Sequence, residues 1–150
     1  MNQRASVSMR PEDVEKLLAD GRKLQLATLN RDGTPHLVSM FYAMVDGRIA
    51  FWTYRASQKA RSLARDPRVT CLVEDGDDYF ELRGAQVTGE VSRIDDLDAV
   101  TEIGRLVAAR MPGPAAAVLD EYVARTAAKR SAYLVEPHRV VSWDHRRLVG

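Results

Sequence analysis

The sequence predicts a mainly β protein of one domain, built on a small antiparallel barrel with a few helices. Six segments have the residue pattern of strands, and tight turns rather than helices join the first three of them. A parallel sheet would instead need a helix between nearly every pair of strands. The length of 150 residues is close to that of a single domain. These three observations together predict the six-stranded barrel.

The chain begins with residues 1–9, which we expect to form a loose tail. A helix should start at Pro11, because proline suits the first helical position. Gly21 suits the left-handed residue that often follows a helix end. Apolar residues recur at helical spacing between these two positions, so this helix should present one buried face.

Three strands then follow as a meander. The first two are Lys23–Asn30 and Pro35–Val45, and an Asp-Gly pair at 32–33 joins them. A second Asp-Gly pair at 46–47 leads into Arg48–Tyr54. Asp-Gly supplies the positive φ that a tight hairpin needs, so both connections should be hairpin turns.

The strand Pro35–Val45 carries apolar residues on both of its faces. In a small monomeric barrel, one face of a strand is buried and the other meets water. We therefore expect the outer face of this strand to pack against another subunit. Cover by a helix of the same chain is the alternative.

The middle of the chain predicts a helix over Ser57–Arg65, with its first residue as the N-cap. The strand Arg68–Glu74 follows. The segment Tyr79–Ile94 is too long for one regular strand, and Gly84 and Gly89 inside it suggest a bulge or bend. The buried stripe of the helix should consist of small and aliphatic residues: Ala60, Leu63 and Ala64.

The last third of the chain predicts two helices and a final strand. Asp95 or Asp96 can cap a helix that runs to about Met111. A second helix should cover Ala115–Ala128. The last strand, Ser131–Trp143, is interrupted by the proline at position 137, because proline cannot donate a ladder hydrogen bond.

Composition argues against several classes of protein. There are 22 basic and 21 acidic residues, a net charge of +1, whereas a dedicated nucleic-acid binder carries a large basic excess. The single cysteine, Cys71, rules out a disulfide framework and fits a reducing compartment. No apolar run approaches the roughly 18 residues of a membrane span. We therefore expect a soluble, cytoplasmic protein.

The segment Phe51–Arg68 carries the most informative chemistry. A strand leads into a helix whose start is capped by Ser57, with Lys59 in the first turn. Free backbone N–H groups, a hydroxyl and an ammonium group at one point can bind a phosphate. Five basic residues and one acidic residue lie between Arg55 and Arg68. The plainer interpretation, a solvent-exposed helix with a capping serine, stays open.

The remaining side chains offer no catalytic group. His36, His138 and His145 lack the spacing of metal ligands. Cys71 lies in the middle of a strand, where a buried thiol is the usual case. There is no glycine-rich nucleotide motif and no serine nucleophile elbow. A phosphate anchor without a nucleophile or an acid–base pair indicates a bound cofactor that supplies the chemistry.

Several short motifs, in a fixed order, carry a family resemblance. They are F-W-T at Phe51–Thr53, the S-x-K-A-R-x-L-x-x-D-P-R-V pattern from Ser57, Y-F-E-L-R-G at Tyr79–Gly84, and the closing segment Glu136–Asp144. Together they resemble the pyridoxamine-phosphate-oxidase-like, FMN-binding split β-barrels over about residues 24–148. They are most similar to the actinobacterial branch that uses the deazaflavin coenzyme F420.

The resemblance implies a homodimer with two equivalent cofactor sites at the subunit interface. It implies that Ser57 and Lys59 hold the cofactor phosphate. It also implies three groups around the ring system: His36, Leu37, Val38, Ser39, Trp52 and Thr53 line it, Glu81, Leu82, Arg83 and Gly84 close over it, and Arg139 and Trp143 reach in from the partner chain.

Two departures from the FMN-binding members concern the phosphate clamp. Their R-x-V-L-L-K motif is His36–Phe41 here, without either basic end, and their S-R-K is Ser57-Gln58-Lys59. Each missing charge-assisted hydrogen bond is worth about 1.5–3 kcal/mol, so the site looks less suited to FMN. The poly-glutamate tail of coenzyme F420 would need dispersed cations, and four are available: Arg55, Arg61, Lys129 and Arg130.

The sequence therefore predicts an F420-dependent oxidoreductase. It would transfer a hydride from reduced coenzyme F420 to an unsaturated or conjugated small molecule. One alternative is an FMN-dependent oxidoreductase on the same fold. Another is a non-catalytic protein that binds F420, a flavin or haem. A small-molecule substrate and a second copy of the chain are the expected partners, with no nucleic acid, membrane or metal.

Overall fold

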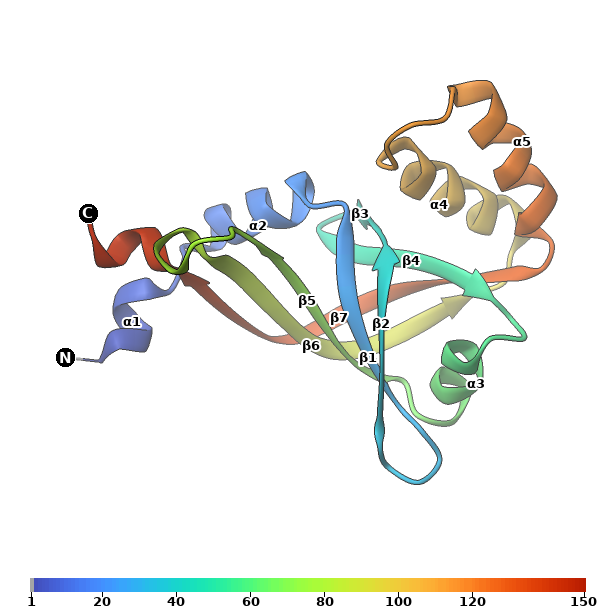
Figure 1. Ribbon diagram of the computed structural model, residues 1–150. Helices are drawn as coiled ribbons and strands as arrows, with labels where there is room; N and C mark the ends of the chain where they lie inside the picture. Colours follow the sequence, from blue (N-terminus) through green and yellow to red (C-terminus); the bar gives the residue numbers. More distant parts are fainter. Residues whose placement is uncertain (1) are drawn as a thin grey trace.

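The computed structural model describes residues 2–150, which form one curled antiparallel sheet of seven strands (Figure 1). The strand order is β2-β1-β5-β6-β7-β4-β3. The two edge strands, β2 and β3, follow each other in the chain, so the barrel is split there. The strand bounds are β1 Lys23–Leu29, β2 Pro35–Phe41, β3 Ala43–Val45, β4 Arg48–Tyr54, β5 Arg68–Asp75, β6 Arg83–Ile94 and β7 Arg130–Asp144. The prediction of a mainly β split barrel is confirmed.

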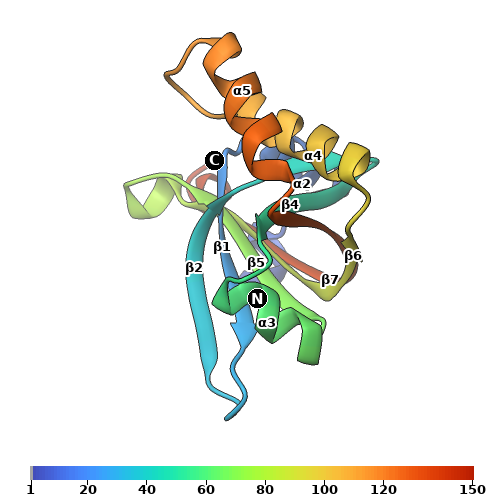
Figure 2. The ribbon, with the colours of Figure 1, turned by 90° about the vertical axis from the view of Figure 1, so that its right-hand side faces the viewer.

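Helices pack around this sheet without entering it. In Figure 2, α4 and α5 form a hairpin that lies over β4, while α3 sits at the other end of that strand. No helix within residues 2–150 is long and apolar enough to cross a membrane. The helices are α1 Gln3–Val7, α2 Pro11–Asp20, α3 Gln58–Arg65, α4 Leu97–Ala109 and α5 Ala116–Ala127, with single 3-10 turns η1 Tyr79–Glu81 and η2 His145–Leu148.

Strand β4 is buried on both faces and separates two apolar clusters. Phe51 points into the barrel, where its ring stacks on that of Tyr133 with 5.2 Å between centroids. Trp52 points the other way, into a cluster beneath α4 and α5. The barrel cluster includes Leu24, Leu26, Cys71 and Val135. The helix-covered cluster includes Val100, Val107, Val123 and Ala132.

The prediction of a loose tail is wrong for residues 3–7, which form α1. Asn2 caps this helix, and Val7 on it is buried. The chain is then tied to the last strand, because the backbone N–H of Met9 donates to Oγ of Ser142 at 3.0 Å. Met1 lies outside the described residues.

Tyr42 divides the segment predicted as one long strand into β2 and β3, which explains seven strands instead of six. Its ring is fully buried, and its hydroxyl donates to the carbonyl oxygen of Leu18 at 2.5 Å. The hydroxyl also explains Gly21, whose predicted left-handed conformation is wrong, since its φ is −68°. A Cβ on Gly21 would lie 2.5 Å from Oη of Tyr42, so close packing requires the glycine.

Two further details of the sequence prediction need correction. On α3 the third buried residue is Ser62 rather than Ala64, which is exposed. Residues 79–81 form η1 instead of extending the following strand, because the Asp78 carboxylate accepts from the N–H of Phe80 and caps a turn.

The predicted bulge in the long β6–β7 ladder is confirmed. The register shifts between Thr88 and Gly89: Thr88 pairs with Arg139, and Gly89 pairs with Pro137. A Cβ on Gly89 would lie 2.0 Å from the carbonyl oxygen of Glu136, so only glycine fits this close approach. Because of the bulge, β7 bends and reaches from one end of the molecule to the other (Figure 1).

Candidate functional site

The start of α3 is built as the sequence predicts. Oγ of Ser57 accepts from the backbone N–H of Ala60 at 3.1 Å and from the hydroxyl of Thr53 at 3.3 Å. The hydroxyl proton of Ser57 is not used in any hydrogen bond among residues 2–150. The turn after β4 thus places the free hydroxyl donor of Ser57 at the N-terminus of α3, which is a suitable place for an anion.

Lys59 stands beside this cap, in the first turn of α3. Its side chain is half-buried, and this desolvation lowers its pKa. The positive charge of Arg130 lowers the pKa of Lys59 further, and no carboxylate acts in the opposite direction. A half-buried ammonium that faces another cation without a counter-ion is an electrostatic arrangement that an anion would relieve.

The beginning of β7 is fastened to this corner through Arg55. The backbone N–H of Arg55 donates to the carbonyl of Lys129 at 3.0 Å. Its guanidinium donates to the carbonyls of Ala128 at 2.5 Å and Arg130 at 3.3 Å. Three of the four cations available for an anionic tail therefore belong to segments that meet here, whereas Arg61 lies further along α3.

The sequence predicts Arg130 only as one of four dispersed cations, but in the structure it is the most enclosed charge at this corner. Its residue is only 9% exposed. The guanidinium carbon lies 4.3 Å from the ring centroid of Trp52 and 4.1 Å from that of Tyr54. The pairing of β4 with β7 places Tyr54 opposite Arg130, which no local sequence pattern could reveal.

The predicted ring-lining residues of β2 lie on the neighbouring hairpin. His36 and Val38 are half-buried, while Leu37 and Ser39 on the other face are exposed. His36 shares a recess with Gln58, the first residue of α3. The side-chain amide of Gln58 donates to Oδ1 of Asn30 at 3.1 Å, which links the β1–β2 hairpin to the helix start. Trp52 and Thr53 are buried at the end of β4.

The remaining predicted residues lie at the opposite end of the molecule, with both chain termini (Figure 1). Glu81 and Leu82 lie beside η2, and Arg83 pairs with Asp75 at 2.5 Å. Trp143 packs over Gly84, where a Cβ would lie 2.2 Å from the indole ring. Arg139 is exposed on β7 between the two ends. Within one chain, the predicted residues therefore form two separate groups.

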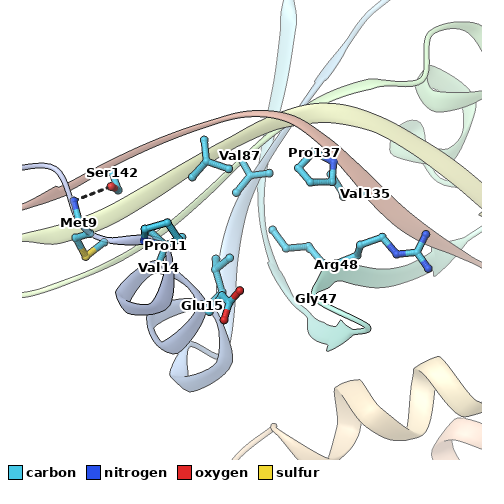
Figure 3. A pocket seen from close by; sticks show the side chains of 13 residues that line it. Met9, Pro11, Val14, Glu15, Gly47, Arg48, Val87, Val135, Pro137 and Ser142 are labelled. Atoms are coloured by element: carbon cyan, nitrogen blue, oxygen red, sulfur yellow. Dashed lines mark hydrogen bonds between the residues drawn. The ribbon is translucent and has the colours of Figure 1, made fainter.

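A third region, an apolar cavity of about 390 Å³, lies between α2, the β3–β4 turn and β7 (Figure 3). Val14 of α2 and Val87 and Val135 of the sheet line it. Arg48 also lines this cavity, and its guanidinium forms an ion pair with Glu136. None of the residues predicted to bind a cofactor lines this cavity.

The described residues give little support for a metal site or for a cysteine nucleophile. Within residues 2–150, no three His, Cys, Asp or Glu side chains are grouped as metal ligands. Cys71 is completely buried, and this burial raises the pKa of its thiol to about 12. The thiol is therefore protonated at neutral pH and is not a nucleophile.

Comparisons with known proteins agree with the fold. A family model for pyridoxamine 5'-phosphate oxidase matches residues 11–144. A conserved hypothetical protein from Mycobacterium tuberculosis is 37% identical, with a TM-score of 0.90, and the match covers 100% of this chain and 94% of that one. A search of curated proteins found no significant match.

Two further solved structures are more distant. An F420 reductase is 26% identical, with a TM-score of 0.68 over 87% of this chain and 98% of that one. A FAD-binding protein from Mesorhizobium loti is 19% identical, with a TM-score of 0.65 over 90% of this chain and 94% of that one, and shows the fold alone. The family match includes every strand of the sheet and both groups of site residues, so this chain belongs to the pyridoxamine 5'-phosphate oxidase family.

Proposed function

We propose that this protein is a reductase that binds coenzyme F420 at the start of α3 and reduces an unsaturated or conjugated small molecule. The observation that carries the proposal is the pair formed by Ser57, with its unused hydroxyl proton, and Lys59, a half-buried cation without a counter-ion. The likeness to a solved F420 reductase supports this choice of coenzyme.

The cations at this corner fit a deazaflavin with a long anionic tail better than they fit FMN. The motifs of the FMN-binding members have basic residues at the positions that Phe41 and Gln58 occupy in this chain. In their place, the exposed residues Arg55 and Lys129 extend the positive charge away from the helix start along the α5–β7 junction. A tail with several carboxylates would follow that direction.

When bound, the reduced deazaflavin supplies the hydride. The chain's own residues would bind and orient the coenzyme. The Ser57 hydroxyl and the Lys59 ammonium would donate to the phosphate, and both hydrogen bonds would be charge-assisted because the phosphate is anionic. Two parts of the sheet would line the ring: the half-buried face of β2, with His36 and Val38, and the end of β4, with Trp52 and Thr53. No side chain is assigned as an acid, so the product takes its proton from solvent.

We further propose that the working form is a homodimer. The predicted site residues lie at two ends of one chain, one at α3 and the other near the chain termini, and a second copy would bring one end of one chain beside the other end of its partner (Figure 1). Leu37 on the outer face of β2 is 67% exposed, so apolar surface is available for such a contact. Analytical ultracentrifugation should show a dimer, and a monomer at all concentrations would refute this part.

Binding and turnover together test the proposed function. Purified protein is titrated with coenzyme F420 and, separately, with FMN, and reduced F420 is then mixed with a panel of enones and quinones. We expect F420 to bind at least tenfold more tightly than FMN, and its oxidation to require both protein and acceptor. Protein that retains FMN through purification would favour the FMN alternative. Tight F420 binding without turnover would identify a binding protein instead.

A further inference from the structure

A small pocket beneath the α4–α5 hairpin combines apolar walls with one buried charge. Its volume is about 140 Å³. Figure 2 shows the hairpin that covers this region, above β4. The walls include Phe41 from the end of β2, Trp52 from β4, Val107 and Met111 from α4 and Tyr122 from α5, and the charge is the guanidinium of Arg130 from β7.

Arg130 is not neutralised by the protein. Its residue is 9% exposed, and none of the ion pairs among residues 2–150 includes it. One Nη donates to the hydroxyl of Tyr122 at 2.7 Å, but Nε is buried without any partner. A buried cation normally has an ion-pair partner, because desolvation of an unpaired charge is costly.

The aromatic rings around Arg130 compensate for part of this cost but leave its hydrogen-bonding capacity unused. Stacking on Trp52 at 4.3 Å and Tyr54 at 4.1 Å stabilises the positive charge through the ring faces. Ring faces leave the N–H donors in the plane of the guanidinium without strong acceptors. A planar anion approaching in that plane would supply both the missing charge and the missing acceptors.

The size and position of the pocket restrict what could occupy it. A volume of about 140 Å³ corresponds to a few water molecules and does not hold a tricyclic coenzyme with its tail. The pocket shares Trp52 with the predicted ring-lining residues, so an occupant would lie beside the ring rather than replace it. Its aromatic and aliphatic walls favour a flat apolar group behind the anion.

We propose that this pocket, the Arg130 pocket, binds the carboxylate of a small planar acid, with Arg130 as the counter-ion. The substrates of the reductase would then be conjugated carboxylic acids rather than neutral enones. This second statement depends on the proposed reductase function, whereas carboxylate binding does not. A carboxylate is favoured over a phosphate because it matches a single guanidinium fork in two hydrogen bonds and requires little space.

Benzoate and its neutral analogue benzamide test the pocket without any coenzyme. The chain has two tryptophans, so a Trp143→Phe variant leaves Trp52, which lines the pocket, as the only indole reporter. We expect benzoate to change the Trp52 fluorescence saturably and to bind at least tenfold more tightly than benzamide. Arg130→Gln in this background should weaken benzoate binding at least tenfold and leave benzamide binding unchanged. Arg125→Gln removes an exposed charge from α5 and is the matched control.

Equal affinity for benzoate and benzamide would overturn the proposal, as would benzoate binding that survives Arg130→Gln or no binding of either probe. If Arg130→Gln does not fold, Arg130→Lys keeps the charge but removes the planar fork, and its benzoate affinity should still fall several-fold. Because no coenzyme is present, benzoate binding together with failure of F420 to bind would refute the reductase and retain the pocket. Turnover of neutral enones but not of conjugated acids would refute only the substrate class.

Discussion

Replacement of Lys59 by alanine should weaken coenzyme binding while leaving the barrel intact. Lys59 lies in the first turn of α3, half-buried and without a carboxylate that affects its pKa. Its removal therefore breaks no ion pair within the chain. Its removal also relieves the repulsion from Arg130, so the expected loss concerns binding and not folding.

The size of the loss follows from the environment of the ammonium group. A charge-assisted hydrogen bond contributes about 1.5–3 kcal/mol, and the upper part of that range requires desolvation. Lys59 is only partly buried, so the lower part applies, and each 1.4 kcal/mol corresponds to about tenfold in affinity. We expect the dissociation constant for F420 to rise about tenfold to thirtyfold.

The assay is a titration of deazaflavin fluorescence, with circular dichroism to verify folding. Arg65→Ala is the matched control, because Arg65 is an exposed cation in the last turn of the same helix. This control should change the affinity less than twofold at physiological salt. If both variants bind F420 as tightly as the original chain, or lose affinity equally, the start of α3 does not hold the phosphate.

Three predictions concern stability. Burial raises the pKa of Cys71 from 9.0 to about 12. Between these two pH values the unfolded chain has lost a proton that the native state keeps. The free energy of unfolding should therefore fall as the pH rises, by up to about 1.4 kcal/mol per pH unit. Urea unfolding at pH 8 to 11 should show a shallower decline for Cys71→Ala. Gly104→Ala would place a Cβ 2.5 Å from the ring of Trp52 and should destabilise the fold by about 1–3 kcal/mol in the same assay, and a neutral effect would contradict the packing. Asp96→Ala removes the carboxylate that accepts from the N–H of Ala99 at 3.0 Å and should cost about 1 kcal/mol, visible as a lower melting temperature.

The features that could be predicted from the sequence are those with local causes. Asp-Gly at 46–47 forms its hairpin turn, with φ of 50° and 76°. Ser57 and Asp96 cap the helices at which they were expected, because a short polar side chain next to an amphipathic segment is sufficient for a cap. The bulge at Gly89 was also visible as a glycine within a long strand.

The features that could not be predicted depend on contacts between distant segments. Tyr42 interrupts a strand because its hydroxyl reaches Leu18 on another element, and nothing in the alternation of residues 35–45 shows that partner. The same holds for the candidate site. Ser57 and Lys59 have a local signature, whereas the enclosure of Arg130 by Tyr54 and Tyr122 arises only when β4 and β7 pair and α5 packs beside them.

The bulge also decides which side chains of β7 can meet a second molecule. Before it, Tyr133 and Val135 face the barrel, so odd-numbered residues point inward. After the unpaired His138, alternation resumes one residue later, and Val140 now shares the inner side with Val87, its partner across the ladder. Arg139 and Trp143 are thereby presented outward. If His138 instead took a place in the ladder, the alternation set by Val135 would continue and turn both side chains toward the barrel, away from any neighbouring chain.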